Sequence, residues 1–452
     1  MIRKVLVANR GEIAARIIEA CRQCGVASVA VYSEPDAQAP YLKQADEAYP
    51  LGGALATESY LNQAALLEIA GKAQCDAVHP GYGFLAENAE FATAVEQAGM
   101  AWIGPTPECI VAMGSKHQAR QLAVELGVPV VPGSAILSAD DAALAEAASS
   151  VGFPLLVKAS GGGGGIGMRA VAKPEDLAAA VRATRDLAGK HFSDSAIYLE
   201  RLVAQPRHIE VQVFGFGDGQ AVHLYERDCS IQRRYQKVVE EAPAPNLPEA
   251  TLEKMRAAAL ALACGQKYRG AGTVEFLYDT DTGEFYFLEM NTRIQVEHPI
   301  TEMITGADLV AMQIKLAAGT LAPIEQSALN QHGHAFECRV YAERPAKHFL
   351  PSTGVLETFA PPVEGAGVRV DTGYAQGMKV THLYDPLIAK VITWGETREL
   401  AAARMRDALA AFQVSGVETN LGMLQALMSH DAVLNGTPTT QFLSLYPGTA
   451  VA

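Results

Sequence analysis

Short apolar runs alternate with helix-like stretches along the first part of the chain. The runs at 5–9 and 27–33 are rich in β-branched residues and predict buried strands, whereas 57–71 places apolar side chains at helix spacing. Residues 76–84 and 101–106 each predict a buried strand that ends in a Gly/Pro loop. This alternation predicts a parallel sheet with helices on both faces, whose binding loops lie at the carboxyl ends of the strands.

The pattern changes after this region. Residues 115–127 predict a helix, and 134–203 predict a smaller α/β unit. From residue 204 onward long strands and hairpins dominate, 307–319 predict another helix, and 334–445 predict shorter strands with two helices. The chain is therefore expected to combine a parallel α/β region with a region of β-hairpins.

Five consecutive glycines, residues 161–165, interrupt the smaller unit. Gly162, Gly164 and Gly167 formally match a dinucleotide motif, but that motif must open a helix, and the following MRAVA predicts a strand. No Gly-Lys-Ser/Thr follows, which argues against a Walker loop. A glycine hairpin with Lys158 on its entering strand is suited to cover the phosphates of a nucleotide, and a flexible linker is the alternative.

Two apolar runs separated by DTDTGE predict a β-hairpin within residues 273–297. If its turn centres on Thr282, Glu275 and Glu289 lie opposite each other on one face. Two opposed carboxylates destabilise an apolar hairpin unless a cation lies between them. Mg²⁺ prefers carboxylate oxygens and keeps places for phosphate oxygens, so this pair predicts a metal–nucleotide site.

The polar period continues beyond this pair. From Glu289 onward, polar residues occupy every second position of one predicted strand: Glu289, Asn291, Arg293, Gln295 and Glu297. A solvent-exposed face is the alternative, but the row lacks the Lys and Ser residues expected on such a face. Arg293 can hold a planar anion through two hydrogen bonds, and Glu297 can take a proton from it.

A third polar segment covers residues 226–245. It places Arg233, Arg234 and Lys237 close together and predicts either an anion-binding loop near the nucleotide or a solvated loop with internal ion pairs. His208 alternates with apolar neighbours and is expected on a polar face, where an ordinary surface histidine would also lie.

Composition restricts these hypotheses. The 452 residues carry a formal charge of −14, with 49% hydrophobic and 19% charged residues, which is typical of a globular chain. An acidic chain without a Lys/Arg run is a poor general binder of nucleic acid. We find no apolar stretch long enough to span a membrane and no signal peptide. The seven scattered cysteines suit reduced thiols in the cytoplasm, and Cys21 and Cys24 are expected to be ordinary helix residues.

Six motifs together resemble biotin carboxylases of the ATP-grasp superfamily, along essentially the whole chain. They are ANRGEIAARI (8–17), HPGYGFLAEN (79–88), KASGGGGGIGMR (158–169), ERDCSIQRRYQKVVEEAPAP (226–245), EMNTRIQVEHPITEMITG (289–306) and ECRVYAE (337–343). The resemblance implies an α/β fold, α+β overall, of the ATP-grasp type. Its domains would be a Rossmann-like N-terminal domain (1–114), a linker helix with a mobile lid (115–203), and a catalytic domain with a mixed, barrel-like sheet (204–452, including 334–445).

The resemblance also implies where ligands bind. ATP contacts are expected from Lys116, Lys158, Gly162, Gly163, Gly164, Gly165, Met168, Glu200, His208, Gln232 and Leu277. Ligands of Mg²⁺ or Mn²⁺ are expected at Glu275, Glu289 and Asn291, and a bicarbonate cradle at Arg293, Gln295 and the Val296 backbone. Glu297 would be the base, Lys237 would lie between bicarbonate and the γ-phosphate, and Arg339 would stabilise the biotin enolate.

The activity implied is carboxylation of biotin N1′ by bicarbonate and MgATP, through carboxyphosphate. The segment 377–380 (GMKV) is similar to a biotin-attachment site but lacks the carrier domain such a site needs, so a plain strand is expected. Biotin is therefore expected on a separate biotin carboxyl carrier protein, with a separate carboxyltransferase, and a homodimer is possible. The alternatives are another ATP-grasp ligase that joins a carboxylate or carbamate to an amine, and a silent nucleotide-binding subunit.

Departures from the family pattern concern the acceptor and the dimer rather than the chemistry. Ile166 stands where many relatives carry Arg or Lys, and Tyr235 replaces a histidine near the ribose. Glu19 and Gln23 replace an Arg/Glu pair used in a dimer interface of the family. The final carboxyl acceptor (an acyl-CoA, pyruvate, urea or another compound) is set by the carboxyltransferase and not by this chain.

Overall fold

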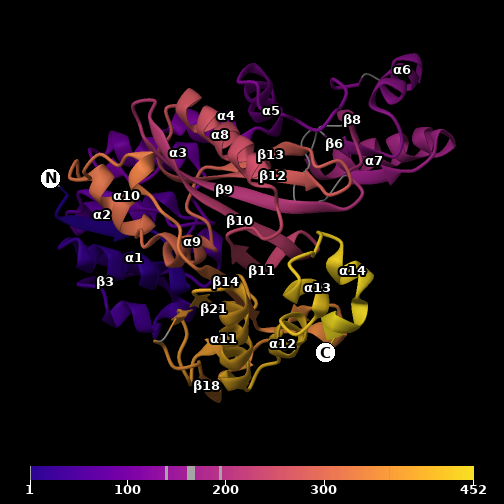
Figure 1. Ribbon diagram of the computed structural model, residues 1–452. Coiled ribbons are helices and arrows are strands. Elements are labelled where there is room, and N and C mark those ends of the chain that lie inside the picture. The colour runs from indigo at the N-terminus through magenta and orange to yellow at the C-terminus, as the bar shows by residue number, and fades with distance from the viewer. Residues whose placement is uncertain (1, 138–140, 160–167, 193–195, 366, 452) are drawn as a thin grey trace.

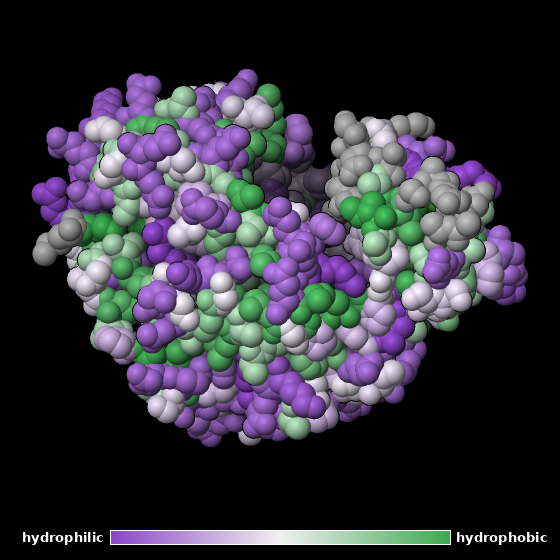
Figure 2. Space-filling model, turned by 90° about the horizontal axis from the view of Figure 1, so that it is seen from above, coloured by the Kyte–Doolittle hydropathy of each residue, from purple (hydrophilic) through white to green (hydrophobic). Residues whose placement is uncertain are grey.

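The computed structural model describes residues 2–137, 141–159, 168–192, 196–365 and 367–451 (Figure 1). A small unit around α6 (Asp141–Val151) and α7 (Leu177–Phe192) projects from the main body at the upper right of Figure 1. Seen from above, this unit stands beside the body across a hollow (Figure 2). Within the described ranges, no helix is long and apolar enough to cross a membrane.

A parallel five-stranded sheet forms the N-terminal region, in the order β3-β2-β1-β4-β5. Its strands are β1 (Lys4–Val7), β2 (Ala27–Ser33), β3 (Glu47–Gly52), β4 (Ala77–His79) and β5 (Ala101–Trp102), and its helices are α1 (Gly11–Gln23), α2 (Gln63–Lys72) and α3 (Ala89–Gln97). Alternation along β1 supplies two cores, because Val5 and Val7 pack in the core of α1, whereas Leu6 packs in the core of α2 and α3. The predicted parallel sheet is confirmed.

The small unit follows α4 (Pro107–Gly114) and α5 (Lys116–Glu125). Its sheet has the order β7-β6-β8 and consists of β6 (Leu155–Ala159), β7 (Met168–Val171) and β8 (Ile197–Arg201). Apolar residues of this sheet and of α6 and α7 form a core of their own. The strands that flank the glycine run pair antiparallel, with Lys158 opposite Met168, as the strand–glycine–strand prediction requires. Gly162 to Gly165, and Ile166, lie outside the described residues.

An eight-stranded sheet organises the rest of the chain, in the order β13-β12-β9-β10-β11-β14-β21-β19. Its strands are β9 (Pro206–Phe216), β10 (Ala221–Arg233), β11 (Gln236–Ala242), β12 (Arg269–Asp279), β13 (Phe285–Asn291), β14 (His334–Tyr341), β19 (Val368–Asp371) and β21 (Leu387–Gly395). Neighbouring strands pair antiparallel at every junction of this sheet, so the expectation of a mixed sheet is wrong in this detail. The reason is that short hairpins join β9 to β10, β10 to β11 and β12 to β13.

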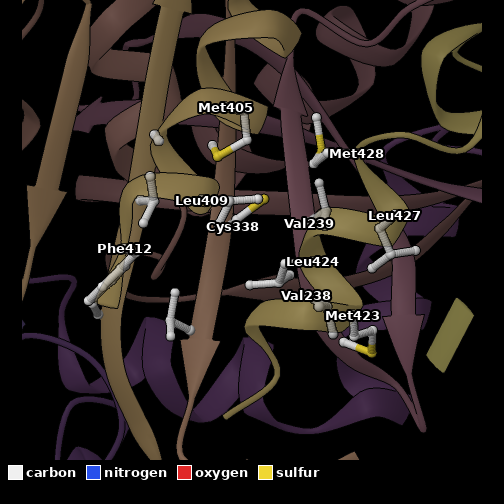
Figure 3. Packing of buried hydrophobic residues seen from close by; sticks show 14 of the residues in the cluster. Val238, Val239, Cys338, Met405, Leu409, Phe412, Met423, Leu424, Leu427 and Met428 are labelled. Carbon is white, nitrogen blue, oxygen red and sulfur yellow. The ribbon is translucent and has the colours of Figure 1, made fainter. Parts of the chain in front are cut away.

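Helices cover this sheet and provide its core. They are α8 (Glu249–Gly265), α9 (His298–Thr305), α10 (Leu309–Ala317), α11 (Arg398–Ala411) and α12 (Leu421–Leu427). Under α11 and α12, Met405 and Leu424 pack against Val238 of β11 and Cys338 of β14 (Figure 3). The GMKV segment is an ordinary short strand, β20 (Lys379–Val380), paired with β17 (Gly354–Val355), as expected.

Two predictions of local structure are wrong. The polar row from Glu289 to Glu297 is not one strand, because β13 ends at Asn291 and the chain bends until α9 begins at His298. The segment 226–245 is not a loop: β10 and β11 form a hairpin whose turn holds Arg234 and Tyr235 at φ of 51° and 68°. Its charged side chains find partners inside the sheet, which is why an alternating charged sequence can form a buried hairpin.

Candidate active site

Lys237 of β11 lies among three buried carboxylates. Its Nζ is 2.5 Å from Oε2 of Glu210, 2.8 Å from Oε1 of Glu275 and 2.7 Å from Oε1 of Glu297. Glu210 and Glu275 are directly opposite each other on β9 and β12, so the sheet itself sets their spacing. Burial alone would lower the pKa of Lys237, but the three carboxylates outweigh it and raise that pKa well above its ordinary value. The ammonium therefore stays charged at the centre of the site.

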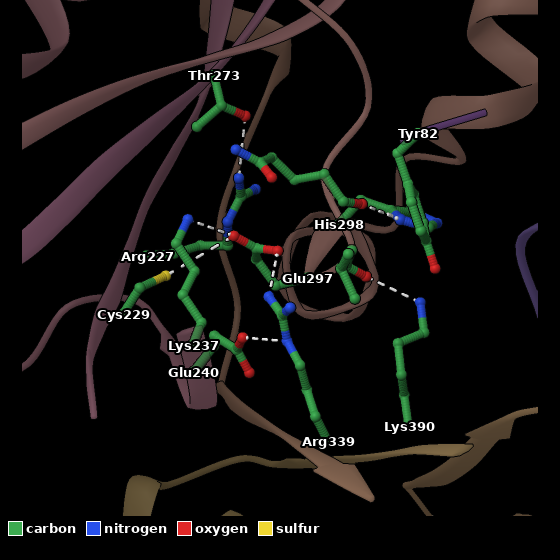
Figure 4. A network of polar contacts seen from close by, with 12 residues as sticks. Tyr82, Arg227, Cys229, Lys237, Glu240, Thr273, Glu297, His298, Arg339 and Lys390 are labelled. Atoms are coloured by element: carbon green, nitrogen blue, oxygen red, sulfur yellow. Dashed lines mark hydrogen bonds and ion pairs between the residues drawn. The ribbon is translucent and has the colours of Figure 1, made fainter. Parts of the chain in front are cut away.

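Glu297, the residue that precedes α9, connects two cations (Figure 4). Lys237 donates to its Oε1, and Nη2 of Arg339 donates to its Oε2 at 2.9 Å. Burial alone would raise the pKa of Glu297, but Lys237 and Arg339 outweigh it and hold that pKa well below its ordinary value. The group is a carboxylate that can accept a proton, but a weak base while both cations remain in place.

Arg339 of β14 is itself held from the other side. Its Nε donates to Oε1 of Glu240 at 2.6 Å. Burial and the Glu297 charge outweigh the opposing effect of Arg339 and raise the pKa of Glu240 to about 7. The guanidinium thus lies between two carboxylates and points one edge at Glu297.

Glu275 gathers the polar row that the sequence indicated. Oε1 accepts hydrogen bonds from Nδ2 of Asn291 at 2.9 Å and from Nε2 of Gln295 at 3.1 Å, and Nε2 of His208 lies 3.0 Å from Oε2. Burial would raise the pKa of Glu275, but Lys237 and His208 outweigh it and lower that pKa. The side chains therefore meet as the i+2 spacing predicts, although the backbone leaves the strand.

Glu275 and Glu289 are directly opposite each other on β12 and β13, as predicted. Glu289 has a half-exposed side chain, and its carboxylate lies 3.7 Å from Nζ of Lys116. Burial and the neighbouring charge of Glu275 raise the pKa of Glu289. Two carboxylates that face each other are donors that suit Mg²⁺ or Mn²⁺, so this pair fits such an ion. The Asn291 amide turns its nitrogen to Glu275, and its oxygen accepts a hydrogen bond from Arg293.

Arg293 is fixed in the bend after β13. Its Nε donates to Oε2 of Glu87 at 2.9 Å, and its Nη atoms donate to Asn291, Gln295 and the carbonyl of Ile294. Glu87 also accepts a hydrogen bond from the Thr292 backbone at 3.2 Å. The loop between β4 and α3 of the N-terminal region thus orients the arginine that the sequence assigned to an anion.

The residues assigned to ATP fall into two groups. On the eight-stranded sheet, Gln232 and His208 share a hydrogen bond of 2.8 Å, and Leu277 pairs with His208 in register. On the small unit, Lys158 forms an ion pair with Glu200. Among the contacts of the described residues, none joins Lys158 or Glu200 to Lys237, and the two groups lie on separate sheets.

Several residues of the site were not predicted. Glu87 and Glu240 each hold a predicted arginine, and Glu210 holds Lys237. Arg227, fully buried, donates to Oε1 of Glu210 at 2.6 Å. Glu210 follows His208 in the i+2 row of β9, and this row was the one sequence signal that pointed to it.

Family models match most of the chain. Residues 1–110 match the biotin carboxylase N-terminal domain, 115–324 match the ATP-binding domain of the carbamoyl-phosphate synthase L chain, and 337–445 match the biotin carboxylase C-terminal domain. Biotin carboxylase 1 of Bacillus subtilis is 45% identical over 446 residues, which are 99% of both chains. The α subunit of rice mitochondrial methylcrotonoyl-CoA carboxylase is 46% identical over 98% of the chain, but the chain spans only 60% of that relative.

Solved structures resemble the whole chain. Biotin carboxylase of Campylobacter jejuni, in complex with β-γ-ATP, has a TM-score of 0.93 and 41% identity, and the match covers 98% of this chain and 99% of that one. The biotin carboxylase domain dimer of Hydrogenobacter thermophilus 2-oxoglutarate carboxylase, in complex with MgADP, ADP and bicarbonate, has a TM-score of 0.93 and 43% identity. That match covers 100% of this chain and 99% of the other.

Proposed function

The chain belongs to the biotin carboxylase family, and from this membership we propose that it carboxylates N1′ of biotin with bicarbonate and MgATP. The observation that carries the proposal is the position of Glu297. This buried carboxylate has Lys237 on one oxygen and Arg339 on the other, and the bend that precedes it carries Arg293. A base, two separate cations and an anion holder are the groups that a bicarbonate-activating site needs.

The first step joins bicarbonate to phosphate. Bicarbonate binds against Arg293, Gln295 and the Val296 backbone, and Glu297 takes its proton. The resulting oxygen attacks the γ-phosphorus of ATP, the bond to the β-phosphate oxygen breaks, and ADP and carboxyphosphate result. A Mg²⁺ or Mn²⁺ ion at Glu275, Glu289 and Asn291 supplies positive charge to the phosphates.

Lys237 links nucleotide binding to the strength of the base. Among the cations that lower the pKa of Glu297, its effect is the largest. If its ammonium turns toward the γ-phosphate, the pKa of Glu297 rises, and the carboxylate becomes a better proton acceptor when ATP is present. Removal of the bicarbonate proton is therefore favoured in the complex that already holds ATP, the partner of the next step.

The second step transfers the carboxyl group. Carboxyphosphate breaks into CO₂ and phosphate, phosphate takes the N1′ proton of biotin, and N1′ attacks CO₂. Arg339 stabilises the enolate oxygen of the biotin ring, because a fixed guanidinium offers hydrogen bonds to developing negative charge. Arg339 needs no reorientation for this task, since Glu240 already holds it.

The nucleotide occupies the space between the two sheets. On the small unit we assign Lys158, Glu200 and Met168 to ATP, and the sequence adds the glycines at 162–165, which lie outside the described residues. On the main body we assign Lys116, His208, Gln232 and Leu277. The corresponding division of the chain is 1–114, 115–203 and 204–452.

Carrier, transferase and assembly belong to the same proposal. Biotin would arrive on a biotin carboxyl carrier protein, and a carboxyltransferase would use the product. The Hydrogenobacter structure is a dimer, which supports a homodimer here. In this chain Glu19 pairs with Arg22 at 2.6 Å within α1 and also accepts from Gln23, so these two residues are engaged within the protomer. A cytoplasmic location stays a prediction.

The deciding assay follows ADP release at saturating MgATP. We expect ATP hydrolysis that requires bicarbonate and that rises when free biotin is added. Bicarbonate dependence without any effect of biotin would instead favour another ATP-grasp ligase, and no hydrolysis under any condition would favour a silent nucleotide-binding subunit.

A further inference from the structure

The bend between β13 and α9 is irregular, and side chains donate to three of its carbonyl groups. Nδ1 of His298 donates to the carbonyl of Gln295 at 2.8 Å, and Arg293 donates to the carbonyl of Ile294 at 3.2 Å. The carbonyl of Val296 receives its hydrogen bond from Lys390, at 2.8 Å. This last contact is the long-range one, because Lys390 lies on β21.

Lys390 is a fully buried lysine with two carboxylate partners. Its Nζ lies 3.2 Å from Oε2 of Glu12 and 3.4 Å from Oδ2 of Asp371. Burial would lower the pKa of Lys390, but Glu12, followed by Glu337 and Asp371, outweighs it and raises that pKa. The ammonium is thus held as a charged donor, and a charge-assisted hydrogen bond to a carbonyl is stronger than a neutral one.

The partners of Lys390 come from separate parts of the chain. Glu12 lies in the first turn of α1 and also accepts a hydrogen bond from Tyr82 of the HPGYGFLAEN loop. Asp371 ends β19 and is held by Arg369 at 2.7 Å. Just beyond it, a Cβ at Gly373 would come within 2.4 Å of the Gly11 backbone, so the two segments touch directly. The N-terminal and C-terminal regions therefore fix the ammonium together.

Lys390 and Arg339 are directly opposite each other on β21 and β14. Both side chains rise toward Glu297 in Figure 4. Arg339 contacts the Glu297 carboxylate, whereas Lys390 contacts the carbonyl of the peptide that joins Val296 to Glu297. One strand pair thus holds the base residue at its side chain and at its backbone.

We propose that Lys390 is a positioning residue for bicarbonate activation, which fixes the Val296–Glu297 peptide so that the bicarbonate cradle and the base keep their geometry. The inference rests on the proposed function for its chemistry and on the Val296 contact for its geometry. It predicts a defect in the use of bicarbonate and not in the binding of ATP, because within the described part of the chain no contact of Lys390 involves a residue assigned to the nucleotide.

The first test is Lys390→Met, assayed as bicarbonate-dependent ATP hydrolysis. We expect KM for bicarbonate to rise about tenfold, equal to about 1.4 kcal/mol, while KM for ATP stays within about twofold. Lys390→Met also leaves two carboxylates without their shared cation. The triple variant E12Q/K390M/D371N removes these charges together at similar side-chain volume, and it should show the same split between the two KM values.

The matched control is Arg256→Met. Arg256 of α8 is a buried cation paired with Glu226 at 2.8 Å, and it touches no residue assigned to the site. Its loss should lower the melting temperature and leave KM for bicarbonate within about twofold of the wild type. The positioning role would be overturned if KM for bicarbonate and KM for ATP both rose in the Lys390 variants. It would also be overturned if neither KM rose in a Lys390 variant that is folded.

Hydrogen exchange separates this inference from the proposed function. In Lys390→Met, but not in Arg256→Met, amides of residues 293–298 should exchange about tenfold faster, because the peptide loses its anchor. Unchanged exchange in this segment refutes the inference even if the enzyme is a biotin carboxylase. If residues 293–298 exchange faster in Lys390→Met but biotin does not stimulate ATP hydrolysis by the wild type, the contact of Lys390 with the peptide is supported and only the proposed function is refuted.

Discussion

Replacing Glu297 by glutamine tests the proposed base with little change in shape. The amide keeps the size of the side chain but removes the negative charge between Lys237 and Arg339, 2.7 Å and 2.9 Å away. Both cations keep another carboxylate, Glu275 for Lys237 and Glu240 for Arg339, so the fold should survive with a loss of about 1.5–3 kcal/mol. A general base contributes about 10²–10⁴-fold to the rate. We therefore expect kcat/KM for bicarbonate to fall by this factor, which equals an increase of about 3–5 kcal/mol in the activation free energy.

The assay measures ADP release against bicarbonate concentration at saturating MgATP. Glu226→Gln is the matched control, since Glu226 is also a buried carboxylate paired with an arginine but lies on the side of β10 that faces α8. We expect the control to retain turnover and Glu297→Gln to lose it while both proteins unfold cooperatively. Turnover of Glu297→Gln within about threefold of the wild type would show that another group takes the proton.

Three further predictions concern single groups. Arg339→Met should reduce biotin carboxylation about 10²–10³-fold and bicarbonate-dependent ATP hydrolysis much less, and equal losses would contradict the enolate role. Glu289→Gln should raise the Mg²⁺ concentration needed for half activity at least about tenfold in an EDTA-treated enzyme, and an unchanged requirement would remove Glu289 from the metal site. Asp371→Asn should lower stability at pH 7 by about 3 kcal/mol, measured by denaturant unfolding. Burial would raise the pKa of Asp371, but Arg369 and Lys390 outweigh it and lower that pKa, so the stabilisation is present above pH ~4 and lost as pH falls. The difference between wild type and Asp371→Asn should therefore shrink below pH ~4, and a difference that grows there would be the wrong sign.

The fold could be predicted where burial leaves a clear pattern. Strands β1, β2 and β4 are apolar runs, and the sequence identified each of them. Strand β3 was missed because it is an edge strand that alternates exposed and half-buried residues and contains Pro50. The 226–245 hairpin was misjudged for a related reason, since charged residues such as Arg233 and Glu240 pair with partners far away in the chain.

The site could be predicted as far as local spacing extends. A turn centred on Thr282 predicts that Glu275 and Glu289 are opposite, and the structure has this pair. The pair depends on a register shift between Glu275 and Phe276, because Phe276 pairs with Phe287, and the turn alone does not show this shift. The end of β13 could not be predicted, because the Thr292 amide bonds to Glu87, 205 residues away. Glu240 and Lys390 likewise act through contacts across strands whose order the sequence does not show.

The separate core of the small unit has a consequence for how the protein can change shape. Leu155 and Leu199 belong to the core of that unit, whereas the described residues at its junction with the body include a small cluster of Val131, Val203 and Tyr286 and polar contacts such as the Arg201–Glu284 pair. Rotation about this junction leaves the apolar burial within the unit unchanged, so its free-energy cost is small. The distances within the three-stranded sheet and within the eight-stranded sheet are set by their own hydrogen bonds and cores. The separation of the two sheets can change at small cost, so a bound nucleotide can determine it.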